Sequence, residues 1–217
     1  MQILRNKHRN YDPVWHVEVI MLVAIAMQLA LPSRYVFGVR WVIPALEVLM
    51  MAVLAVTTPR QKVFTSFRRR LSVVVLVGVT AIGNVYALSQ VASHLLQTGR
   101  IEDGRALIMT AINIYLTNII IFALLYWEMD GGGPGHRRVA DDAERDFLFP
   151  QSSLQSLKGW HPTFIDYLYV SSTNATAFSP TDTMPLSRRA KMLMLLQAVV
   201  SLVVVALVAA RAVNILN

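Results

Sequence analysis

The chain has 217 residues, of which 55% are hydrophobic and 15% are charged, and its formal net charge is +7. A soluble domain carries about 25% charged residues, so this chain has too few charges to cover a globular surface. The surplus apolar area predicts a lipid bilayer as the surrounding medium, and the lack of cysteine excludes disulfides, zinc–thiolate sites and iron–sulfur clusters. Because most basic residues lie between apolar runs, the positive charge favours topology signals over nucleic-acid binding.

Four long apolar runs come first, at residues 15–31, 41–58, 71–96 and 106–127. Each is close to the roughly 20 residues that a helix needs to cross about 30 Å of hydrocarbon, where a helix satisfies its own backbone hydrogen bonds. Residues 1–127 are therefore expected to form a four-helix transmembrane region. Glu47 is an acid within the second run, where it either pairs with a basic residue or titrates as part of ion coupling.

A polar segment follows at residues 128–162 and is expected to be a linker. It opens with the glycine-rich sequence 131–135, which lacks the Gly-Lys-Ser/Thr of a phosphate-binding loop and so favours a flexible connection. Its acidic residues do not have the spacing of an EF-hand loop, so a solvated stretch is preferred to a cation site. These acidic residues are Asp141, Asp142, Glu144 and Asp146.

The last part of the chain, residues 163–217, combines a short apolar helix, a polar stretch and a long apolar helix. Residues 164–178 are too few to span a bilayer, whereas residues 190–215 are enough. This order is the layout of a re-entrant pore loop, in which non-helical backbone lines a cavity at membrane depth. The sequence therefore predicts an all-α integral membrane protein with five transmembrane helices, one re-entrant pore helix and a filter-like loop.

The distribution of Lys and Arg predicts the orientation of these helices. One side of the membrane receives most of the 20 basic residues, namely Arg5, Lys7, Arg9, Arg60, Lys62, Arg68, Arg69, Arg70, Arg137, Arg138, Arg145, Lys158, Arg188, Arg189 and Lys191. The other side receives Arg34, Arg40, Arg100, Arg105 and Arg211. The richer side is expected to be cytoplasmic. The N-terminus and the polar segment 128–162 are then cytoplasmic, in a bacterial inner (plasma) membrane, and the C-terminus is outside.

Residues 169–185 resemble the pore module of tetrameric potassium channels. The end of the pore helix matches Ala175 and Thr176, and a later proline matches Pro185. The family's T-V-G-Y-G-D signature falls on Ala177, Phe178, Ser179, Pro180, Thr181 and Asp182. The resemblance implies a homotetramer in which each chain contributes one pore loop.

The filter-like residues depart from that family. Ser179 and Thr181 replace both glycines that a ladder of inward-pointing carbonyls requires, so potassium selectivity by the usual filter is not expected. The ion pathway is instead expected to use the side-chain oxygens of Thr176, Ser179, Thr181 and Asp182. Asp182 either attracts cations as a ring at the entrance or anchors the loop through backbone N–H groups or Arg188.

Two polar residues of the last helix, Gln197 and Ser201, lie four positions apart and share one face. They line a pore if there is one, and otherwise they form hydrogen bonds between helices. Both interpretations stay open from the sequence.

A second resemblance is to an uncharacterised bacterial family of multi-pass membrane proteins. It is carried by Phe149-Pro150, residues 166–169, Asp182 and residues 187–189, and it implies no function. The leading hypothesis is a channel or channel-like protein that passes inorganic cations, and the alternative is a non-conducting accessory or sensor protein. No H-E-x-x-H or G-x-S-x-G motif is present, so we expect no enzyme activity, cofactor or metal site.

Overall fold

The computed structural model of the protein describes residues 14–29, 45, 48–49, 52, 67–97, 104–134, 136–137, 144–157, 160–176 and 182–216. Its long helices are α1 (Val14–Leu29), α3 (Phe67–Gln97), α4 (Gly104–Met129), α5 (Phe164–Thr176) and α6 (Arg188–Leu216). The shorter elements are the 3₁₀ helices η2 (Asp130–Gly132), η4 (Pro150–Ser153) and η5 (Gln155–Leu157), and the strands β1 (Phe147–Leu148) and β2 (Met184–Pro185). The described part of the chain is thus mostly helical, as the sequence predicts.

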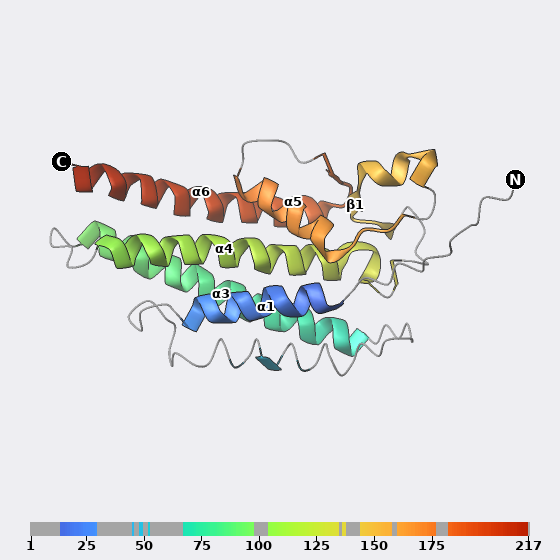
Figure 1. Ribbon diagram of the computed structural model, residues 1–217, viewed down its shortest axis with the longest axis horizontal. Helices are drawn as coiled ribbons and strands as arrows, with labels where there is room; N and C mark the ends of the chain where they lie inside the picture. The colour runs from blue at the N-terminus through green and yellow to red at the C-terminus, as the bar shows by residue number, and fades with distance from the viewer. Residues whose placement is uncertain are drawn as a thin grey trace, which may run out of the picture.

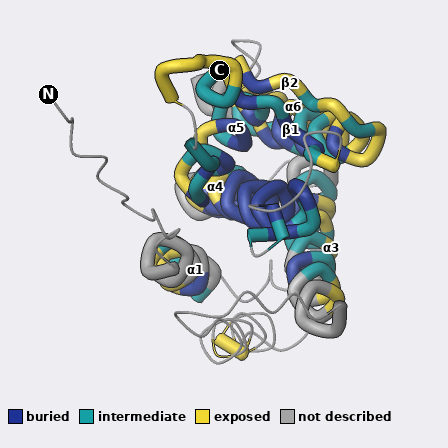
Figure 2. Tube along the Cα trace, turned by 90° about the vertical axis from the view of Figure 1, so that its right-hand side faces the viewer, coloured by how far each residue is buried: buried dark blue, intermediate teal, exposed yellow. Residues whose placement is uncertain are grey.

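The central helix is α4, which packs against α1, α3, α5 and α6 (Figures 1 and 2). Residues 117–128 of α4 are all buried. This stretch includes the run Ile119-Ile-Ile-Phe-Ala-Leu-Leu125, which has no polar face, and a helix that is apolar all round belongs inside a bundle. The other helices therefore surround α4 and present their second faces to the exterior.

Two helices in the described part of the chain are long and apolar enough to cross a membrane, at Ile108–Gly132 and Arg188–Ala210. The second of these, in α6, is largely unburied, and its outward face is apolar: Met192, Leu195, Leu196, Val199, Leu202, Val203 and Val205. Such a surface is costly in water and ordinary in lipid. Both observations favour a membrane location.

The helices α1, α3, α4, α5 and α6 occupy the apolar segments that the sequence indicates, with ends that differ by a few residues. The second predicted run, 41–58, lies outside the described residues apart from positions 45, 48, 49 and 52. Glu47 likewise lies outside them.

The two short strands bring distant parts of the chain together at one end of the bundle. β1 pairs with β2 in an antiparallel sheet, with Phe147 opposite Pro185 and Leu148 opposite Met184. The backbone N–H of Leu186 also donates to the carbonyl oxygen of Asp146 at 2.8 Å. The residues that precede α5 are therefore joined directly to those that precede α6.

The prediction of a flexible linker is wrong for the described residues of segment 128–162. Phe147 and Phe149 are buried against Tyr126 and Tyr167, with ring centroids 5.2 to 6.2 Å apart. Asp146, expected to be solvated, is 1% exposed. The sequence misleads here because three of the charged residues, Asp130, Arg137 and Asp146, are buried and paired inside the fold, so a polar composition does not mean a solvated segment.

The glycines at the start of this segment serve a tight turn. Gly131, Gly132 and Gly133 all have positive φ, and a Cβ on Gly133 would meet the carbonyl oxygen of Glu128 at 3.1 Å. Only glycine adopts such angles without strain. The turn reverses the chain directly after α4 and returns Arg137 to the end of that helix.

Candidate functional site

The short helix α5 and the two chain segments that hold its ends form the candidate site. In Figure 1, α5 runs from the end of the bundle where β1 lies toward the middle of α6. Its polar face lies against α4 and α6, and separate groups of polar side chains hold its N-terminus, through Thr163 and Tyr167, and its C-terminal half, through Ser171 and Asn174.

The N-terminus of α5 is capped by its own first turn. A carboxylate oxygen of Asp166 accepts hydrogen bonds from the backbone N–H of Thr163 at 2.7 Å and from the Thr163 hydroxyl at 2.9 Å. This is the reciprocal half of a capping box, with aspartate as the acid, and the negative charge also suits the positive end of the helix dipole. The local sequence therefore specifies where α5 begins.

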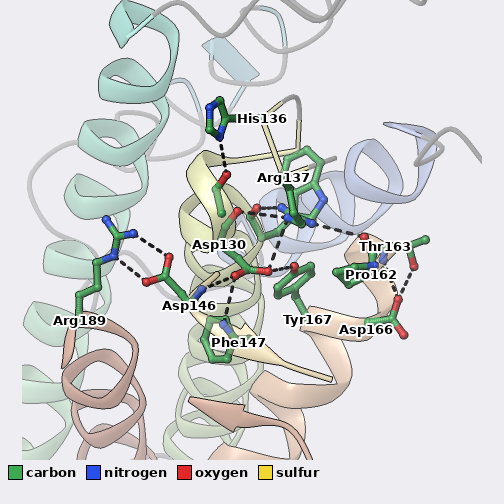
Figure 3. Close-up of polar contacts among 12 residues, drawn as sticks. Asp130, His136, Arg137, Asp146, Phe147, Pro162, Thr163, Asp166, Tyr167 and Arg189 are labelled. Carbon is green, nitrogen blue, oxygen red and sulfur yellow. Dashed lines mark hydrogen bonds and ion pairs between the residues drawn. The ribbon is translucent and has the colours of Figure 1, made fainter. Parts of the chain in front are cut away.

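A charged cluster made of Asp130, Arg137, Asp146, Tyr167 and Arg189 lies at the same end of the bundle (Figure 3). Asp130 is at its centre and is 1% exposed. One carboxylate oxygen accepts the backbone N–H groups of Asp146 and Phe147 at 2.7 and 3.1 Å, and the other accepts the Tyr167 hydroxyl. One carboxylate thus joins the end of α4, the start of β1 and the second turn of α5.

Arg137 is the buried cation of this cluster. Its Nε lies 3.6 Å from the second carboxylate oxygen of Asp130, and its guanidinium carbon lies 4.7 Å from the centroid of the Tyr167 ring. The guanidinium also donates to the carbonyl oxygens of Trp127, Asp130 and Pro162. A cation at the C-terminus of α4 satisfies carbonyls that the helix leaves unpaired and opposes the negative end of its dipole.

The second ion pair of the cluster fixes the first turn of α6. Arg189 donates from Nε and Nη2 to the two carboxylate oxygens of Asp146, at 2.7 and 2.9 Å. This bidentate geometry is the strong form of an Arg–carboxylate pair. Asp146 is buried, whereas the Arg189 side chain is 52% exposed. Asp146 therefore links two parts of the cluster: its carboxylate binds Arg189 at the start of α6, and its backbone N–H donates to Asp130.

An amide cluster of Tyr126, Ser171, Asn174 and Gln197 holds the other end of α5. The Gln197 amide oxygen accepts from the Tyr126 hydroxyl at 2.6 Å and from Asn174 Nδ2 at 2.8 Å. Its amide nitrogen donates to the carbonyl and the hydroxyl oxygens of Ser171 at 2.9 and 2.6 Å. The whole hydrogen-bonding capacity of this 0% exposed side chain is used between helices.

Each outer helix is also joined to α4 by one polar side chain. Ser171 donates to the Ile119 carbonyl, Asn118 donates to the Ser201 hydroxyl at 3.1 Å, and Asn84 donates to the Ile114 carbonyl at 3.1 Å. Asn113 donates to the Met27 carbonyl of α1. Hydrogen bonds of this kind hold helices together in an apolar medium, where the hydrophobic effect between helices is absent.

The predicted ion-pathway residues are described in part. Thr176 is the exposed last residue of α5, and Asp182 is exposed in the bend before β2. Within the described ranges, no hydrogen bond or ion pair joins Asp182 to another residue, so the anchoring bond expected with Arg188 is not found there. The residues that lie outside the described ranges are Ala177, Phe178, Ser179, Pro180 and Thr181.

Gln197 and Ser201 are both 0% exposed; Gln197 forms hydrogen bonds with α4 and α5, and Ser201 accepts one from Asn118 of α4. These contacts are those of the packing interpretation, and a role in a pore stays a prediction.

Sequence reasoning missed the charged cluster. One of its ion pairs, Asp146 with Arg189, holds the start of α6, and the sequence alone assigns neither residue to a site. A signal was present in the sequence, because Asp146 directly precedes the apolar triplet Phe147-Leu148-Phe149, which a solvated stretch would not contain.

Among the described residues, no group of three or more His, Asp or Glu side chains is arranged to hold a metal ion. No family model, curated protein or solved structure matches the chain. The proposals below therefore rest on the geometry of α5, α6 and the two polar clusters.

Proposed function

We propose that the chain is one subunit of a cation-conducting, channel-like membrane protein, in which α5 and the residues after it form a re-entrant pore loop. In this proposal five helices span a bacterial inner membrane, the N-terminus is cytoplasmic, and four copies surround one axis. One chain offers one such loop, and a loop-lined pathway needs about four, so a homotetramer is part of the proposal.

The observation that carries the proposal is that both ends of the α5 excursion are held at one end of the bundle. Thr163 caps α5 beside the charged cluster, and the chain returns to the same cluster at β2, which pairs with β1. Asn174, near the other end of α5, bonds to Met194 and Gln197 of α6. Gln197 comes nine positions after Arg188. That is roughly 14 Å of helix, about half the thickness of a bilayer core.

The chemistry of the excursion supports a cation as the permeating ion. Asp182, an exposed carboxylate, lies at its return end, and four copies around an axis would raise the local cation concentration.

A second candidate function is a non-conducting accessory or sensor protein with the same architecture. It is favoured by one observation: Gln197 and Ser201, the polar residues of α6 expected to face a pathway, are fully buried by contacts within the chain. If the corresponding face of α6 never meets an axis, the fold can be stable without a pore.

Reconstitution in liposomes separates the two functions. We expect a tetramer by native mass spectrometry, and a cation flux that Asp182→Asn lowers, most strongly at low salt because screening is weak there. The matched control is Glu144→Gln, which removes another exposed carboxylate, 57% exposed, and should leave the flux unchanged. A monomer would contradict the channel proposal, and a tetramer without flux would favour the second function. A flux that Asp182→Asn does not alter would contradict the role of Asp182 at the entrance.

A further inference from the structure

Residues 149–157 and Trp160 contain the 3₁₀ helices η4 and η5 and have an unusual distribution of apolar side chains. Backbone N–H groups donate to the carbonyl three residues earlier at four successive steps: 152 to 149, 154 to 151, 157 to 154, and 160 to 157. In 3₁₀ geometry, residues three apart lie on the same edge. Leu154, an extended residue just before η5, and Leu157, its last residue, are three apart and define one edge of the segment, and Trp160 follows at the same spacing.

The rest of the segment is polar, which makes the apolar edge distinct. Ser152 and Ser153 precede Leu154, and Gln155 and Ser156 lie between Leu154 and Leu157; the last three of these four polar residues are exposed. Leu154 is 51% and Leu157 is 41% exposed. Trp160 is partly buried and contacts Phe149, with ring centroids 5.6 Å apart, so it ties the edge to the aromatic core. The two leucines have no such cover from the described part of the chain.

The position of the segment relates this edge to the membrane boundary. It follows β1, where Phe147 packs on Tyr126 near the end of α4, and the apolar stretch of α4 can span a bilayer. In Figure 1 the segment extends, in yellow-orange, past the first turn of α6. Other exposed apolar side chains lie next to the start of the segment. Leu148, just before it, pairs with Met184, which is 62% exposed, and Leu186 and Met192 follow in the sequence with exposed fractions of 45% and 63%. Two exposed cations, Arg188 and Lys191, lie among these residues in the sequence.

We propose that residues 150–157 and Trp160 lie in the membrane interface, with the Leu154–Leu157 edge inserted at the boundary between lipid headgroups and acyl chains. Apolar side chains on one edge and polar ones on the other are what an interfacial segment requires, and nearby Lys and Arg favour anionic headgroups. Tryptophan is enriched at this depth, which suits Trp160. The segment holds the charged cluster end of the protein against the bilayer surface. This inference rests on the membrane location and not on ion conduction.

Nitroxide labelling tests the insertion, since the chain has no cysteine of its own. Labels are placed singly by Leu154→Cys and Leu157→Cys in vesicles that contain anionic phospholipid. The matched controls Ser153→Cys and Ser156→Cys lie on the polar side of the same turns. Power saturation with oxygen, which concentrates in lipid, and with a nickel chelate, which stays in water, reports the depth of each label.

Labels at 154 and 157 should be relaxed more by oxygen and less by nickel than those at 153 and 156. Equal exposure of all four labels to nickel would overturn the proposal. Spin–spin broadening at 154 and 157 that disappears when labelled protein is diluted with unlabelled protein would also overturn it, because it would identify a second copy as the occupant. A label at Leu195→Cys on α6 serves as the membrane standard, and if it too met only nickel, the membrane location itself would fail.

Discussion

Replacing Asp130 by asparagine should destabilise the protein more than any exposed charge change. Asparagine keeps an oxygen for the backbone N–H groups of Asp146 and Phe147 but removes the charge that faces Arg137, which is 3% exposed. Breaking a buried pair in this way costs about 3–5 kcal/mol. The lower end applies, because Nε and the carboxylate oxygen are 3.6 Å apart and do not form a direct hydrogen bond.

We therefore expect a loss of about 3 kcal/mol in the free energy of unfolding, which is roughly a 150-fold change in the folded-to-unfolded ratio. The assay is reversible unfolding by SDS in mixed micelles, followed by circular dichroism. Tyr167→Phe, which removes one hydrogen bond to the same carboxylate, should cost only about 1 kcal/mol. The control is Glu144→Gln. If Asp130→Asn cost no more than this control, the charged cluster would not be the anchor described here.

Two further substitutions test the ion pair that holds the start of α6 and the amide cluster that holds α5. Arg189→Gln leaves buried Asp146 without its bidentate partner and should lower the free energy of unfolding by about 1–3 kcal/mol, less than for a fully buried pair because Arg189 is half exposed. The control is the neighbouring exposed Arg188→Gln, which should change it by less than about 0.5 kcal/mol. Gln197→Leu strands the Tyr126 hydroxyl and should cost about 1–2 kcal/mol in the same SDS assay, and adding Tyr126→Phe should restore part of the loss, because it removes the stranded donor. Equal effects of the two arginine changes, or no recovery in the double variant, would contradict these assignments.

The long helices could be predicted from sequence because their signal is local. Runs of about 20 apolar residues have few alternatives to a helix in lipid, and α5 is bounded by Thr163 with Asp166, a cap that can be found within four residues. The pairing of Gln197 with Ser201 on one face also followed from helical spacing. What that face contacts did not, because Tyr126 and Ser171 come from other helices.

The charged cluster could not be predicted in the same way, because its bonds join residues far apart in the sequence. Asp130 meets Tyr167 across 37 residues, and Asp146 meets Arg189 across 43. Each charge, considered alone, matches a solvated surface residue. Only the fold shows that they neutralise one another, and this is why a segment with linker composition is part of the core.

A re-entrant loop requires that the start of α5 and the strand β2, which follows the loop, lie on the same side of the membrane. Single cysteines at Ile165 and Met184, 50% and 62% exposed, and one at position 217 can be tested with a membrane-impermeant maleimide in spheroplasts and in inverted vesicles. We predict that 165 and 184 react only in inverted vesicles and that 217 reacts only in spheroplasts. Reaction of 165 and 184 from opposite sides would contradict the account.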